Sequence, residues 1–259
     1  MKILLAFAIC AAVAYALVLL AAYFFADRFM FHPPARTYVR TGETVEFESD
    51  SGAKLAGLFL KSPVPTSVNI FYCHGNGEDL GMVYSGLDSL RKLGCNVFSF
   101  DYDGYGLSEG SPSEENLYKS ARSAWRFAEE KLGFTPQNTV LFGFSLGSAA
   151  VCSVAETRRH WRGIILAGGI ARGVETLLPF DIVPWKILDN TSKIAHFECP
   201  LLIMHGTRDF IVPPRNARRN FAAAKCAKKL VWLDGFGHND ISASPEYRNA
   251  AMQFIKGQQ

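Results

Sequence analysis

The chain has 259 residues, of which 49% are hydrophobic and 20% are charged, and its formal net charge is +3. This length and composition fit one globular α/β domain with a sizeable core, with or without a short appendage, and exclude a largely disordered chain. The small net charge, without a long run of Lys or Arg, speaks against nucleic acid as a partner.

The N-terminal segment is apolar, with no charged residue between Ile3 and Phe25. A helix of this length can cross the hydrocarbon core of a lipid bilayer, for which about 20 residues suffice. A cleavable signal peptide is the alternative, because Ala12-Val13-Ala14 resembles a cleavage site. Cleavage there would leave Leu17 to Phe25 as an apolar remnant. We therefore interpret residues 1–27 as a single-pass membrane anchor and 28–42 as a linker, with the side of the membrane left open.

Beyond the linker, apolar runs alternate with helical patterns. The predicted strands cover residues 44–48, 55–60, 68–73, 96–100, a run from 139 into a turn at 143, 163–166, 200–204 and 230–233. The predicted helices cover 80–93 and 148–155, begin near Ser111 and Ser244, and follow Pro213-Pro214. This alternation predicts one α/β domain, 43–259, with a mostly parallel sheet covered by helices on both faces.

Two local patterns refine this outline. Ser111-Pro112-Ser113-Glu114 combines a serine suited to cap a helix with proline at the first helical position and glutamate three residues on, so we expect a helix that begins near Ser111 with this serine as its cap. The irregular stretch 168–197 is predicted to be a short lid. Its apolar wall would consist of Leu177, Leu178, Phe180, Val183, Trp185, Ile187 and Leu188.

Six cysteines are present, at positions 10, 73, 95, 152, 199 and 226. No Cys-x-x-Cys pair and no histidine spacing typical of zinc accompanies them. We expect buried free thiols in place of a disulfide framework, and neither a metal nor a cofactor.

A Gly-x-Ser-x-Gly motif, Gly143-Phe144-Ser145-Leu146-Gly147, joins a predicted buried strand to a helix of small residues. A serine hydroxyl becomes a good nucleophile when a base removes its proton, and a sharp strand-to-helix turn holds it clear of the backbone. The two glycines permit such a turn because they lack Cβ atoms. A five-residue match also arises by chance, so its strand and helix flanks carry the prediction that Ser145 is a nucleophile.

The candidate base and acid also follow predicted strands. Six histidines compete, and we predict His238 as the base because it lies in a glycine-rich loop after the last strand. We predict Asp209 as the acid that orients it, directly after the strand 200–204. Asp234 and Asp240 are the rivals, interpreted as loop-capping or exposed carboxylates. The chain order Ser145, Asp209, His238 differs from the orders in the chymotrypsin and subtilisin groups.

An oxyanion hole needs two backbone amides aimed at one point. Leu146, directly after the serine, can supply one amide. The loop His74-Gly75-Asn76-Gly77 follows another strand, and we choose Asn76 for the second. In the alternative interpretation, the glycines of this loop serve only a tight strand-to-helix turn.

Five motifs together resemble the membrane-associated α/β-hydrolase domain proteins, a group that includes protein depalmitoylases and lysophospholipid or monoacylglycerol lipases. They are His74 to Gly77, Asp103-Gly104-Tyr105-Gly106, Gly143 to Gly147, His205 to Asp209 and Gly237-His238-Asn239-Asp240, and the match runs from about Thr41 to the C-terminus. The resemblance implies an α/β-hydrolase fold with a triad of Ser145, Asp209 and His238, and an oxyanion hole of the Asn76 and Leu146 amides. It also implies a serine hydrolase of esters or thioesters.

The substrate is less closely specified. The resemblance implies a small acyl ester, a lysolipid or an acylated protein. Depalmitoylases of the family are tethered by a lipidated N-terminal cysteine cluster, whereas this chain has an apolar span with the single Cys10. Two other interpretations stay open: a serine peptidase of the same fold, and a non-catalytic scaffold tethered to the membrane.

Overall fold

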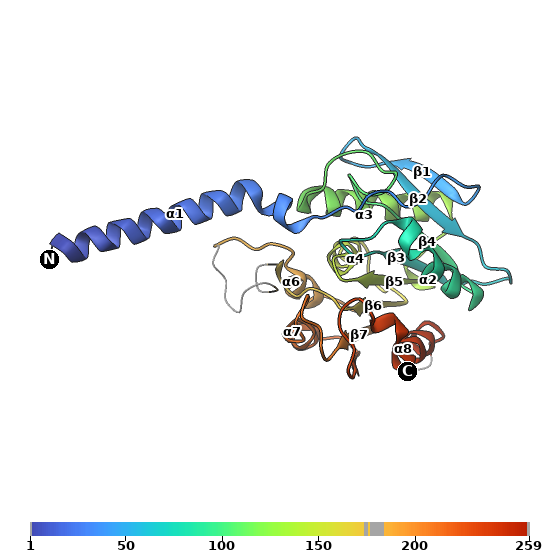
Figure 1. Cartoon of the computed structure of the whole chain (residues 1–259). Coiled ribbons are helices and arrows are strands. Elements are labelled where there is room, and N and C mark those ends of the chain that lie inside the picture. The colour runs from blue at the N-terminus through green and yellow to red at the C-terminus, as the bar shows by residue number, and fades with distance from the viewer. Residues whose placement is uncertain (1, 174–175, 177–183, 258–259) are drawn as a thin grey trace.

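The computed structural model of the chain describes residues 2–173, 176 and 184–257. Figure 1 shows a long N-terminal helix, α1 (Lys2–Met30), that projects from a layered α/β domain. The helix is long and apolar enough to cross a membrane, and its apolar window is not buried by the domain. It ends at Met30, whereas the predicted anchor ends at residue 27.

The centre of the domain is a sheet in the order β1-β2-β4-β3-β5-β6-β7-β8. Both pairings of β2, with β1 and with β4, are antiparallel, and all other neighbours are parallel. The strands are β1 (Thr44–Glu48), β2 (Lys54–Leu60), β3 (Asn69–Cys73), β4 (Asn96–Phe100), β5 (Thr139–Phe144), β6 (Gly163–Ala167), β7 (Leu201–Gly206) and β8 (Lys228–Leu233). The predicted mostly parallel sheet is therefore confirmed.

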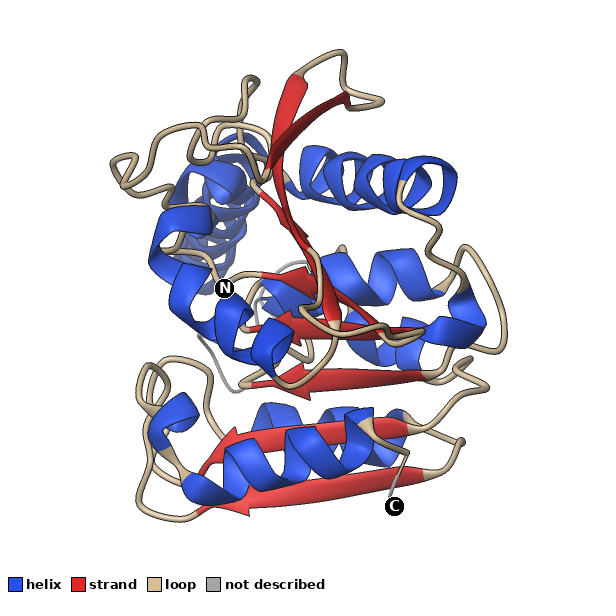
Figure 2. Ribbon diagram, turned by 90° about the vertical axis from the view of Figure 1, so that its right-hand side faces the viewer, coloured by secondary structure: helices blue, strands red, loops and turns tan. Residues whose placement is uncertain are grey.

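Helices cover both faces of the twisted sheet (Figure 2). Alternate residues of each strand point to opposite faces, so that Leu141 of β5 joins one apolar cluster while Val140 and Phe142 join the other. The first cluster includes buried residues of α3 (Glu114–Lys131), α4 (Gly147–Ala155), α6 (Asn190–Ile194) and α7 (Arg215–Ala223). The second includes α2 (Leu80–Lys92), α8 (Pro245–Ile255) and the 3-10 turn η2 (Ile241–Ala243). A further 3-10 turn, η1 (Pro136–Asn138), precedes β5.

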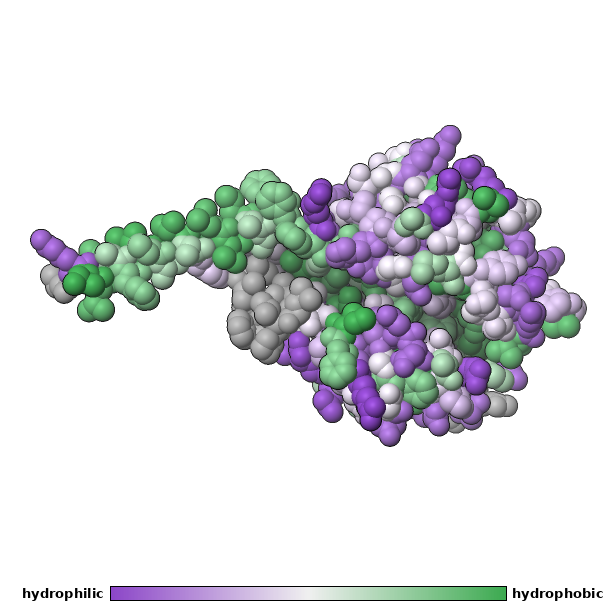
Figure 3. Space-filling model, in the orientation of Figure 1, coloured by the Kyte–Doolittle hydropathy of each residue, from purple (hydrophilic) through white to green (hydrophobic). Residues whose placement is uncertain are grey.

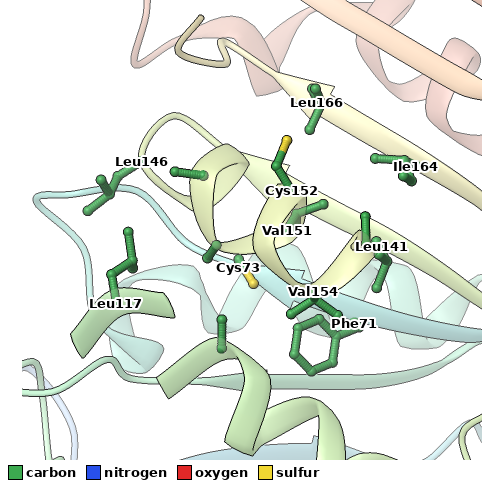
Figure 4. Packing of buried hydrophobic residues seen from close by; sticks show 14 of the residues in the cluster. Phe71, Cys73, Leu117, Leu141, Leu146, Val151, Cys152, Val154, Ile164 and Leu166 are labelled. Atoms are coloured by element: carbon green, nitrogen blue, oxygen red, sulfur yellow. The ribbon is translucent and has the colours of Figure 1, made fainter. Parts of the chain in front are cut away.

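Helix α4 lies in the middle of the first cluster. Figure 4 shows its residues Val151, Cys152 and Val154 among side chains of β5, β6 and α3. Every residue of this helix is buried, which its small side chains allow. All six cysteines are free, and those at 73, 95, 152 and 199 are buried.

A helix is found near Ser111, as predicted, but Ser111 as its cap is wrong. The helix begins at Glu114, and the hydroxyl of Ser113 caps it by accepting a hydrogen bond from the amide of Asn116 at 3.0 Å. The carbonyl of Ser111 instead accepts a bond from the Asn116 side chain. Serine is a common capping residue at either position, and with Ser113 as the cap Pro112 lies before the helix.

The segment after α1 lies against the domain. Phe31 is only 4% exposed and belongs to the first apolar cluster. The amide of Thr37 donates to Asp79, and the hydroxyl of Tyr38 donates to Asp101. The predicted linker is thus held by specific contacts.

Part of the predicted lid lies outside the described residues, including Leu177, Leu178, Phe180 and Val183. In the described part, Ile187 and Leu188 are buried, and Trp185 packs edge-on against Tyr23 of α1. Helix α6 lies within the stretch that was predicted to be irregular.

Candidate active site

Ser145 lies in a sharp turn between β5 and α4. Its φ of 51° is in the left-handed region, where a residue with a side chain is strained. The backbones around it are so close that a Cβ on Gly143 would lie 2.5 Å from the Gly147 carbonyl oxygen, and one on Gly147 would lie 2.0 Å from that of Cys73. The two glycines of the motif are therefore required by sterics. The turn leaves the serine side chain at the carboxyl end of β5, 7% exposed.

His238 reaches Ser145 from the loop after β8. Its Nε2 lies 2.8 Å from Ser145 Oγ. The imidazole stacks on the ring of Phe144, with centroids 5.2 Å apart, and the histidine side chain is only 5% exposed. The residue that precedes the serine thus helps to fix the orientation of the histidine.

Asp209 lies on the other side of the same imidazole. Its Oδ2 is 2.7 Å from His238 Nδ1, and its Oδ1 accepts hydrogen bonds from the amides of Ile211 and Val212. Burial alone would raise the pKa of Asp209, but hydrogen bonds from His205, His238 and the Val212 amide outweigh it and hold the pKa well below its usual range. The carboxyl group is therefore ionised, and His238 Nδ1 donates to it.

His205 belongs to a motif noted in the sequence, but no role was predicted for it, and it lies near the end of β7 beside the acid. Its Nε2 lies 2.7 Å from the carbonyl oxygen of Val212 and 3.3 Å from Asp209 Oδ2, and the side chain is fully buried. The imidazole thus braces the turn that presents Asp209. The spacing His205-x-x-x-Asp209 is the signal that was available in the sequence.

The amides of Leu146 and Asn76 are the two donors predicted for an oxyanion hole. Within the described part of the chain, neither Leu146 N nor Asn76 N donates to a protein acceptor. The side chain of Asn76 has another role, which sequence reasoning missed. Its Oδ1 accepts from the amide of His32 at 3.0 Å and from the hydroxyl of Tyr105 at 2.6 Å, and its Nδ2 donates to the carbonyl of Met30 at 2.6 Å.

The remaining carboxylates brace loops. Asp234 accepts a bond from the hydroxyl of Thr207, and Asp240 accepts one from the amide of Gly237. Asp101 accepts from the amide of Leu80 and lies 3.4 Å from His74 Nε2. Burial alone would lower the pKa of His74, but Asp101 reverses this and raises it.

A cavity of about 580 Å³ opens over Ser145 and His238. Its wall includes the loop Gly75 to Gly77, the aromatic rings of Tyr72 and Tyr247, and His32, which follows α1 by two residues. The space is large enough for a small-molecule substrate, and apolar side chains and the Asn76 loop both form part of its wall.

The family described as serine aminopeptidase, S33, matches residues 65–194. The α/β-hydrolase domain-containing protein 17C of Xenopus tropicalis is 31% identical over 223 residues, which cover 82% of this chain and 69% of that protein. An esterase of Pyrococcus furiosus has a TM-score of 0.72 at 16% identity, over 87% of this chain and 99% of its own. A monoacylglycerol lipase of Paleococcus ferrophilus has a TM-score of 0.64 at 20% identity, over 79% and 99%. The similarity to these two structures shows the fold. The family match and the 31% identical relative show in addition that the chain belongs to the α/β-hydrolase family and is a serine hydrolase.

Proposed function

We propose that Ser145, His238 and Asp209 form a catalytic triad that hydrolyses carboxylic esters or thioesters of acyl compounds. One observation carries this assignment: a single imidazole lies 2.8 Å from the serine oxygen through Nε2 and 2.7 Å from a carboxylate oxygen through Nδ1. These contacts join a nucleophile, a base and an orienting acid, which is the arrangement that acyl transfer through a serine requires.

In the proposed reaction, Ser145 Oγ attacks the substrate carbonyl carbon while His238 Nε2 takes the hydroxyl proton. The ionised Asp209 stabilises the imidazolium ion that forms and keeps Nδ1 protonated. Nε2 then gives its proton to the leaving alcohol or thiol, which leaves an ester between the acyl group and Ser145. Water, deprotonated by the same histidine, hydrolyses this intermediate and regenerates the enzyme.

The amides of Leu146 and Asn76 would donate to the oxygen that becomes negative in this reaction. Their lack of protein acceptors within the described chain supports the role, as does the position of the Asn76 loop on the cavity wall. Removal of one such donor typically raises the barrier by about 3 kcal/mol.

The proposed substrates are a small acyl ester, a lysolipid or an acylated protein, each reached at a membrane. The esterase and lipase names among the structural neighbours support the acyl class. The length and apolar character of α1 support a membrane anchor in residues 1–27, followed by a catalytic domain at 43–259. The signal-peptide alternative fits less well, because α1 runs without a break past Ala14 and its last turns pack against the core.

The test is Ser145→Ala in the full-length chain. We expect hydrolysis of p-nitrophenyl butyrate to fall to the background rate, and labelling by a fluorophosphonate probe to disappear, while the variant melts at the temperature of the wild type. Labelling of a different serine, or undiminished turnover by the variant, would contradict the triad.

A peptidase of the same fold is the second candidate, favoured by the description of the matching family. Glu78 on the cavity wall offers a carboxylate to a substrate ammonium group, although its Oε2 already accepts the Gly75 amide at 2.6 Å. Turnover of acyl esters and of aminoacyl anilides by the same preparation separates the two candidates. Preference for the anilides would favour the peptidase.

A further inference from the structure

A second cavity, of about 490 Å³, lies between α2 and α8. Five residues line both this cavity and the one over Ser145, so the two spaces adjoin: Tyr72, Glu78, Met82, Ser242 and Tyr247. Figure 3 shows a hydrophobic hollow on this face of the domain, in the region that α2 and α8 occupy in Figure 1. We refer to the second cavity as the α2–α8 groove.

The groove is lined mainly by apolar side chains beyond the shared residues. Leu87, Leu90 and Leu93 come from α2 or its end, and Ala251 and Met252 come from α8. At the two ends of this lining, Met82 is 52% exposed and Leu93 is 40% exposed. Between these ends, Leu90 and Met252 are half-buried, and Leu87 and Ala251 are buried. An apolar lining that is accessible at both ends and adjoins a catalytic cavity favours an apolar ligand.

The passage from one cavity to the other is aromatic. The ring of Tyr72 packs against Phe142 with centroids 5.2 Å apart, and Phe142 packs against Tyr247 at 6.3 Å. The carboxylate of Glu78 is held by the Gly75 amide at 2.6 Å. A flexible hydrocarbon chain can therefore pass over the rings of the passage with the one shared carboxylate already paired.

We propose that the α2–α8 groove binds the acyl chain of the substrate while its carbonyl group lies at Ser145. This inference rests on the proposed acyl hydrolysis. It adds the place where the acyl chain of the substrate lies, and it specifies that this acyl chain is long and linear. Helix α2 rises about 16 Å between Met82 and Leu93. With carbon–carbon bonds of about 1.5 Å, that distance suits an extended chain of roughly a dozen carbons.

The cavity beside the predicted lid is the competing location. It is lined by α1, α3 and the segment around Trp185 and Ile187. Among the described residues it shares no lining residue with the cavity over Ser145. The α2–α8 groove is therefore the better location for a chain whose ester carbon lies at the serine.

Gly86 provides the test, because it lines the groove on an exposed part of α2 and a Cβ there would meet no heavy atom within 4 Å. Gly86→Phe should fill the groove without disturbing the fold, and Gly86→Ala is the matched control. Ser89→Trp, from the next turn of the same helix, is a second blocking variant. The measurement is kcat/KM of the full-length enzyme for p-nitrophenyl butyrate and dodecanoate below the concentration at which the esters form micelles.

We expect the wild type to prefer dodecanoate, because each methylene that is fully buried adds up to about fourfold to binding. Gly86→Phe and Ser89→Trp should lower kcat/KM for dodecanoate at least tenfold and leave that for butyrate within about twofold, and Gly86→Ala should change neither. If both blocking variants keep the wild-type ratio of the two esters, the groove does not hold the chain, although ester hydrolysis itself stands. Failure of the wild type to hydrolyse either ester or to react with a fluorophosphonate overturns the proposed function instead.

Discussion

At the scale of single residues, the candidate site depends on close backbone approaches as much as on the three reactive side chains. Ser145 is held at a positive φ, and the two flanking glycines leave room only for hydrogen where backbone carbonyls lie next to them. The motif in the sequence carried this information. It did not reveal that the Asn76 side chain binds the end of α1, because that contact joins residues far apart in the sequence. The contact of His205 with Val212, which braces the turn of Asp209, is local, and only the spacing of His205 and Asp209 hinted at it.

The pairing of Asp209 with His238 leads to a prediction. Asp209→Asn replaces an acceptor with an amide that can donate to Nδ1, which turns the imidazole toward the wrong tautomer. We expect kcat to fall by about 10⁴-fold with little change in KM, as for the equivalent change in a serine protease triad.

Asp240→Asn is the control for this variant, since Asp240 was the rival acid and contacts the Gly237 amide. Its kcat should stay within about threefold of the wild type, a change of less than 1 kcal/mol in the barrier. If kcat for p-nitrophenyl butyrate fell further in Asp240→Asn than in Asp209→Asn, Asp240 and not Asp209 would be the acid that orients His238.

At the scale of elements, local pattern predicted the strands well because each core strand is a short apolar run bounded by polar or turn residues. β1 and β4 have the predicted bounds, β7 starts one residue later and ends two residues later than predicted, and β8 starts two residues earlier. The cap of α3 was misplaced because Ser111 has the complete local capping pattern, whereas Ser113 is the cap in the structure. The first residue of the helix makes contacts with residues that lie far away in the sequence, which a local pattern cannot contain. The Glu114 amide donates to Asp27, and the Glu114 carboxylate accepts a hydrogen bond from the amide of Leu188.

Two glycines in helices should respond to alanine in opposite ways. Gly147→Ala places a methyl group against the carbonyls of Cys73 and His74, so α4 must move away from β3. We expect a loss of roughly 3 kcal/mol or more in the free energy of unfolding, together with loss of esterase activity. Gly86→Ala enters open space on α2 and should stabilise the protein by about 0.5–1 kcal/mol.

Urea denaturation followed by circular dichroism measures both variants on one scale. The comparison separates the general effect of alanine on helix stability from the close contact behind the serine. Equal free energies of unfolding for the two variants would mean that α4 can move away from β3 without loss of stability, which contradicts the close contact between Gly147 and the Cys73 carbonyl.

At the scale of the whole molecule, α1 has two parts. Its N-terminal residues, up to Val18, are exposed, whereas Leu19, Ala22, Ala26 and Met30 pack against the core of the domain. Composition alone indicated the apolar span. It could not indicate that the same helix continues onto the domain, since that depends on the partners it meets there.

Truncation tests this division. Removal of residues 1–18 should move the protein from the membrane pellet to the supernatant after ultracentrifugation, with kcat/KM for p-nitrophenyl butyrate within about twofold of the full chain, because the docked part remains. Removal of residues 1–40 also takes away Phe31 and the contacts of Thr37 and Tyr38. Burial of a phenylalanine side chain alone stabilises a protein by about 1.5–3 kcal/mol, so the shorter chain should melt earlier.

A soluble and fully stable 41–259 fragment would contradict the docking of the segment after α1. A chain lacking residues 1–18 that still sediments with membranes would show that another surface holds it there.

The hydrogen bond from Asn76 to Met30 bears on which substrate bonds the proposed nucleophile can contact. Helix α1 is about 44 Å long, more than the hydrocarbon thickness of about 30 Å, and it ends within one hydrogen bond of the loop proposed to hold the oxyanion. The end of the helix is therefore fixed close to the proposed nucleophile. With α1 as the proposed membrane anchor, we expect the enzyme to hydrolyse bonds presented close to the lipid surface, such as those of a lipid or of an acyl chain on a protein segment lying there, and not a bond carried far out into the aqueous phase.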